Sequence, residues 1–177
     1  MRSEIRSLNT QSFLLWLEST ALSTWLRESD SLLAFPTFLT VHTVSMGFLA
    51  GISAAIDLRM LGFAPRVPLL ELKKFLPVIW ISFFISVVTG ITLVISYPTK
   101  ALTNPIFYLK LMLVALSLFV VRLITRRVLE TPRFDSGRLP RNVRALAAIS
   151  ILCWLLLIWV GRSLPYTYGR LLATYPR

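Results

Sequence analysis

Long apolar blocks separated by short polar segments dominate the chain. Four blocks reach or approach the roughly 20 residues that a helix needs to cross the hydrocarbon core of a membrane. They run over residues 31–56, 75–97, 105–125 and 145–162, and the last is the shortest. A transmembrane barrel would instead show alternating segments of about 10 residues. The pattern therefore predicts an all-α, polytopic membrane protein, folded as a single membrane domain with a four-transmembrane-helix bundle.

A shorter segment, residues 11–28, precedes the first block and mixes apolar with polar positions. Its apolar residues share one helical face: Leu14, Leu17, Ala21 and Trp25. This spacing predicts an N-terminal amphipathic helix lying on the outer membrane surface, although Glu18 falls within the apolar face.

Composition and charge support a membrane protein and predict its orientation. Hydrophobic residues make up 55% of the 177 residues and charged residues only 15%, and the formal net charge is +11. Basic residues concentrate in the links after the first and third blocks, and such links stay on the cytoplasmic side. We therefore expect a multi-pass protein of the bacterial inner (cytoplasmic) membrane with both termini outside.

The same features limit the partners. Basic links attract anionic lipid, so the bilayer is the first expected partner, and no soluble domain remains to bind nucleic acid. Small residues spaced by four, at Gly47, Gly51 and Ala55, indicate close contact with another helix, with other membrane subunits or with a second copy. The single cysteine, Cys153, excludes disulfides and clusters held by several thiolates. Asp57 with Arg59 is expected to form a local ion pair.

Ionisable residues at membrane depth are costly and therefore mark functional candidates. The only histidine, His42, lies six residues after Pro36, and Lys110 lies five residues after Pro105. Both spans enter from the same side, so the two side chains reach similar depths. Arg162 closes the fourth span on that side.

His42 is the candidate metal ligand. Its helical face is aromatic, soft and slightly polar, which suits a flat apolar cofactor such as haem b with an axial imidazole. A second axial ligand would be Met46, Lys110, water or a residue of another chain. The alternative is a histidine that only hydrogen-bonds a neighbouring helix, at Ser86 or Thr89.

The two cations also have alternatives. Lys110 either extends to the outer interface or binds a propionate or a quinone oxygen. Arg162 either anchors a lipid headgroup or binds an anion.

Short motifs between Glu18 and Lys110 resemble an uncharacterised family of bacterial four-helix membrane proteins. They are Glu28-Ser29, Phe35-Pro36, Val41-His42, the run from Ile56 to Gly62, Thr89-Gly90, Asn104 to Phe107 with Lys110, and Gly161-Arg162 further on. That family is distantly similar to copper-resistance D-type proteins and to four-helix membrane protoporphyrinogen oxidases. In those oxidases a first-helix histidine and a third-helix lysine form a functional pair associated with b-type haem, and His42 and Lys110 match their positions.

These observations together predict a membrane redox component that binds one b-type haem or related porphyrin near the outer leaflet. His42 would be the axial ligand, Lys110 and Arg162 would neutralise the propionates, and electrons would pass between the quinone pool and an outer-side partner. The alternative is a non-catalytic subunit that anchors or assembles a larger membrane complex. Its partner-binding surfaces would be the helix with Trp16 and Trp25 and the aromatic C-terminal tail with Tyr166, Tyr168 and Tyr175. A third hypothesis is a porphyrinogen or quinone oxidoreductase.

Overall fold

The structure is a computed structural model that describes residues 11–174 apart from 30, 32 and 130–138. The described residues form helices and no strand, which confirms the all-α prediction. Four helices are long and apolar enough to cross a membrane, as predicted. They are built on α3 (Phe35–Leu61), α5 (Leu76–Ser96), α7 (Pro105–Ile124) and α8 (Arg141–Thr174).

The starts and stops of these helices follow from local sequence. A proline stands at the first or second position of α3, α5 and α7, where its missing N–H removes no helical hydrogen bond. The Asn104 side chain accepts a hydrogen bond from the backbone N–H of Ile106 at 3.0 Å and so caps α7. Gly62, with φ of 110°, ends α3 in a left-handed conformation that favours glycine.

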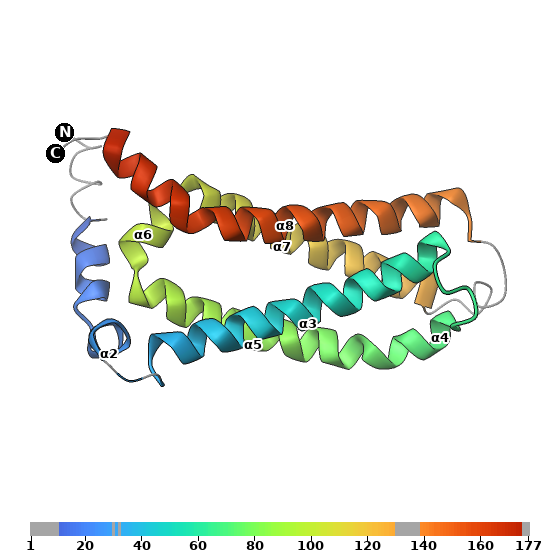
Figure 1. The fold of residues 1–177 in the computed structure, drawn as a ribbon, viewed down its shortest axis with the longest axis horizontal. Helices are drawn as coiled ribbons and strands as arrows, with labels where there is room; N and C mark the ends of the chain where they lie inside the picture. The colour runs from blue at the N-terminus through green and yellow to red at the C-terminus, as the bar shows by residue number, and fades with distance from the viewer. Residues whose placement is uncertain (1–10, 30, 32, 130–138, 175–177) are drawn as a thin grey trace.

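The four long helices run roughly alongside one another (Figure 1). α3 packs against α5 and α8, and α8 packs against α7. Apolar side chains between them form the core, among them Leu49, Met60, Ile79, Trp154 and Leu157. Large apolar side chains also point outward from every span, which is how a helix bundle meets a lipid bilayer.

The segment before α3 differs from the single surface helix predicted for residues 11–28. It forms one helix over residues 11–18 and a second, α2 (Ala21–Glu28). The break lies at Thr20, whose hydroxyl accepts from the N–H of Ser23 at 3.4 Å and caps α2. The Ser23 hydroxyl donates to the carbonyl of Ser96 at 3.3 Å, so α2 is packed against the end of α5.

Glu18 has a partner that explains its place on the apolar face. Its Oε1 accepts from the backbone N–H of Thr99, at 3.4 Å, in the first turn of the short helix α6 (Pro98–Leu102). A carboxylate is stabilised at such a helix start, where backbone N–H groups lack helical acceptors.

The end of α3 and both ends of α8 also differ from the prediction. α3 continues past Ile56 to Leu61, because a polar residue does not stop a helix and Gly62 does. α8 begins at Arg141 and continues past Pro165 to Thr174.

The remaining elements link the spans. α4 (Leu69–Leu72) and the 3₁₀ turn Lys73–Phe75 lead into α5, and a π-helical turn over Thr125–Leu129 extends α7. α2, α6 and the C-terminal part of α8 lie at one end of the molecule and α4 at the other (Figure 1).

Candidate functional site

His42 lies half-buried on the face of α3 that packs against α5. Its Nδ1 is 3.0 Å from the carbonyl oxygen of Ser86 and 3.1 Å from the hydroxyl oxygen of Thr89. The alternative interpretation of this histidine, a hydrogen bond to Ser86 or Thr89 of a neighbouring helix, is therefore confirmed in its contacts, and the metal-ligand role stays a prediction.

The partners of Nδ1 determine which ring nitrogen carries the proton. The Ser86 carbonyl can only accept, and the Thr89 hydroxyl already donates to the carbonyl of Ile85 at 2.7 Å. Nδ1 must therefore be the N–H donor. In a neutral imidazole the lone pair is then on Nε2, which makes no hydrogen bond to the described part of the chain.

Gly90 allows the ring to approach α5 this closely. A Cβ at this position would lie 3.2 Å from Cε1 and 3.6 Å from Nδ1 of His42. The hydrogen bonds to Ser86 and Thr89 hold the ring from the same helix. His42 is thus positioned by three consecutive contacts along one face of α5.

Lys110 reaches the same level of the bundle from α7. It is partly buried, and its charge interacts electrostatically with His42. Its aliphatic stem lies over α8, where a Cβ on Gly161 would be 3.8 Å from Cε of the lysine. His42, Gly90, Lys110 and Gly161 therefore bring all four spans together at one depth.

Arg162 and Met46, the two other predicted site residues, lie near this level. Their binding roles stay predictions. Arg162 follows Gly161 on α8 and is exposed. Met46 lies one turn beyond His42 on α3, partly buried, and packs against the apolar core. Neither residue makes a side-chain hydrogen bond or ion pair within the described chain.

The donor set distinguishes between kinds of metal centre. In the described part of the chain no three His, Cys, Asp or Glu side chains gather as a bare metal ion would require. A haem iron takes four nitrogens from its porphyrin and needs one or two protein ligands. A single imidazole oriented by a backbone carbonyl, with a lysine ammonium near it, fits a haem iron better than a bare metal ion.

Comparisons with known proteins give no functional assignment, so the assignment depends on the geometry of the site. The chain matches no protein-family model, no curated protein and no solved structure. The resemblance to the oxidase and copper-resistance families stays a hypothesis that rests on the quoted motifs.

The sequence paired His42 with Lys110 but did not reveal the two glycines that these side chains pack against. The glycines are visible in the sequence as Gly90, one residue after Thr89, and Gly161, just before Arg162. Only the packing of the helices shows that each glycine faces one of the two polar side chains.

Proposed function

We propose that the protein is an integral membrane redox component that binds one b-type haem or related porphyrin beside His42. The observation that supports this most directly is the pair of acceptors on Nδ1. They orient the ring and leave Nε2 with a lone pair, the arrangement in which histidine ligates metals. The bound haem would supply one-electron chemistry.

The chain's own residues would hold and tune that group. His42 would contribute the axial nitrogen, and its hydrogen bond to the Ser86 carbonyl would raise the basicity of the ligand. Lys110 and Arg162 would neutralise the propionates, since Lys110 lies in the second turn of α7 and Arg162 follows Gly161, the α8 residue that faces Lys110. Electrons would pass between the quinone pool and a partner on the outer side.

The proposed location is the bacterial inner membrane with both termini outside. Its support is the even number of spans, which puts both flanks of the bundle on one side, together with the basic residues of the segments that follow α3 and α7, which favour the cytoplasmic side for those segments.

The test compares haem content in wild type and His42→Ala, both purified in mild detergent after expression with ample haem. We expect near-stoichiometric haem in wild type and its loss in the variant. Imidazole added to the folded variant should restore the spectrum, because it replaces the missing ring. Equal haem content in both proteins would exclude the axial role.

A non-catalytic anchoring role is the second candidate. It is favoured by the small-residue stripe of α3, because nothing lies within 4 Å of a Cβ built on Gly47 or Gly51. Both glycines are therefore open to a helix from another subunit or a second copy. Trp16 and Trp25 also expose 62% and 47% of their surface. Trp25 belongs to α2, which lies at the same end of the molecule as α6 (Figure 1). A colourless, folded protein that co-purifies with other membrane subunits would support this role.

A further inference from the structure

A second polar site lies toward the α4 end of the bundle, about 22 Å from His42 along the axis of α3 at 1.5 Å per residue. Its centre is Asp57, which is only 1% exposed and whose Oδ2 has no hydrogen-bonding partner in the described structure. The prediction of an ion pair between Asp57 and Arg59 is wrong. Arg59 instead donates from Nε to the carbonyl of Val67, and Asp57 is turned inward.

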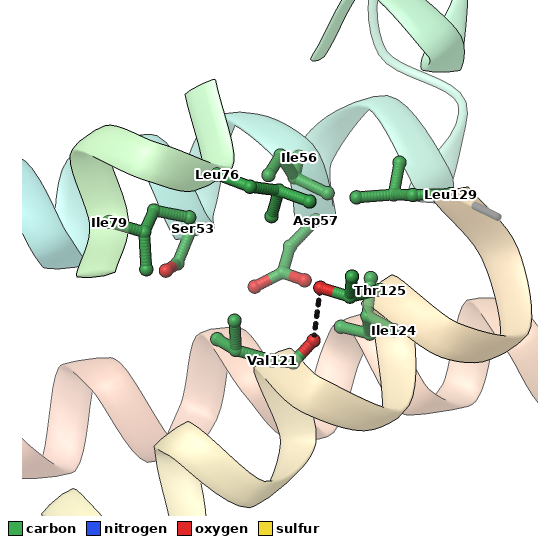
Figure 2. A pocket seen from close by; sticks show the side chains of 9 residues that line it. All are labelled: Ser53, Ile56, Asp57, Leu76, Ile79, Val121, Ile124, Thr125 and Leu129. Carbon is green, nitrogen blue, oxygen red and sulfur yellow. Dashed lines mark hydrogen bonds between the residues drawn. The ribbon is translucent and has the colours of Figure 1, made fainter. Parts of the chain in front are cut away.

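The carboxyl group borders a cavity of about 10 Å³, enough for a single water-sized occupant. Figure 2 shows Asp57 pointing into the space between α3, α5 and α7, with the oxygens of Ser53 and Thr125 near it. The other lining side chains are aliphatic: Ile56, Leu76, Ile79, Val121, Ile124 and Leu129.

The hydroxyls that line the cavity have no hydrogen to offer. Ser53 donates to the carbonyl of Leu49 at 2.8 Å, and Thr125 donates to the carbonyl of Val121 at 2.9 Å, the dashed line of Figure 2. An ionised carboxylate also accepts only. With Asp57 ionised, acceptors would face acceptors across the cavity and only the Ser150 hydroxyl of α8 could donate to the carboxylate, whereas a protonated carboxyl has a hydrogen of its own to donate.

The charged side chains of the described residues around the site do not neutralise an ionised Asp57 carboxylate. In the described part of the chain the basic side chains of this half, apart from the bonded Arg59, are exposed: Arg66, Lys73, Lys74, Arg122, Arg126, Arg127, Arg141 and Arg144. Glu71 of α4 pairs with Lys74 on the surface. From α8, the thiol of Cys153 and the buried hydroxyl of Ser150 face Asp57. Ser150 makes no other hydrogen bond in the described structure, so its oxygen can accept the acid hydrogen of Asp57. An isolated carboxylate is costly in such surroundings, and the uncharged acid is not.

We propose that Asp57 is a proton-binding site inside the bundle, whose carboxyl carries a proton at neutral pH. The acid hydrogen is donated from one carboxyl oxygen to a hydroxyl oxygen of the site. Nothing in this proposal depends on haem. A metal ion fits less well, since Ca²⁺ takes 6 to 8 oxygens and only three oxygen-bearing side chains line the cavity.

The test is infrared spectroscopy of the full chain labelled with carboxyl-¹³C aspartate. The chain has three aspartates, Asp30, Asp57 and Asp135. We expect the carbonyl band of a protonated acid at neutral pH, shifted by the label. It should persist in Asp30→Asn and Asp135→Asn and disappear in Asp57→Asn.

A variant that leaves Asp57 intact guards against misfolding. In the double variant Asp30→Asn/Asp135→Asn the only aspartate is Asp57, so the labelled band must remain at full intensity. Absence of the band there, or its survival in Asp57→Asn, would overturn the proposal. A missing band together with a rise in melting temperature on adding Na⁺, lost in Asp57→Asn, would overturn it in favour of a metal cation.

Discussion

Substitution of Gly90 by alanine tests the packing that positions His42. The added methyl carbon would lie 3.2 Å from Cε1 of the ring, so the ring or α5 must move by a few tenths of an ångström. The ring cannot move freely, because two hydrogen bonds of 3.0 and 3.1 Å hold Nδ1. Overpacking of this kind typically costs about 1–3 kcal/mol.

Gly161→Ala is the matched control. Its new methyl would lie 3.8 Å from Cε of Lys110, an ordinary contact with the middle of a flexible side chain. Both variants gain the same helix propensity, up to about 1 kcal/mol, and this gain cancels in the comparison. We therefore expect Gly90→Ala to be less stable than Gly161→Ala by about 1–3 kcal/mol.

Two measurements on both variants check this expectation. The first is unfolding in detergent followed by circular dichroism. The second is the ¹⁵N spectrum of labelled histidine, which reports on one residue because the chain has a single histidine. The signal should move in Gly90→Ala and stay in Gly161→Ala. Equal stability with an unmoved histidine signal in both variants would refute the described packing of His42 on α5.

Three further predictions address the site and its frame. His42→Ala should lose haem, whereas Lys110→Ala should retain haem at a changed potential. Haem content measured in both variants and a redox titration of Lys110→Ala beside the wild type would show this, and an unchanged potential would contradict the role of the lysine. Asn104→Ala should cost about 1–2 kcal/mol by removing a helix cap. Asn104→Asp should recover only part of this loss in thermal unfolding, because the carboxylate keeps the acceptor for the N–H of Ile106 but loses the N–H donor to the Thr167 hydroxyl. Glu18→Ala should lose about 0.5–1.5 kcal/mol more than Glu18→Gln, which keeps an acceptor for the N–H of Thr99, and equal losses would contradict that contact.

The membrane class and the four spans could be predicted because long apolar blocks have few alternative structures. The contact of His42 with Ser86 and Thr89 could also be predicted, because polar side chains on one face of a span need partners on another span. The depth match of His42 and Lys110 followed from counting residues along two helices that enter from the same side.

Other features depended on information that a single sequence does not contain. Asp57 looked like a residue at a helix end, and only the continuation of α3 to Gly62 turns it into the bundle. The contact of Glu18 with Thr99 joins segments far apart in the chain, so helical periodicity showed only a misplaced charge. The extension of α8 past Pro165 likewise opposes the local expectation that proline ends a helix.

The most direct test of the account is a reduced-minus-oxidised visible spectrum of the protein purified in mild detergent. Axial ligation by His42 should give sharp b-type haem bands at close to one haem per chain. A folded but colourless protein, obtained from cells with ample haem, would contradict it.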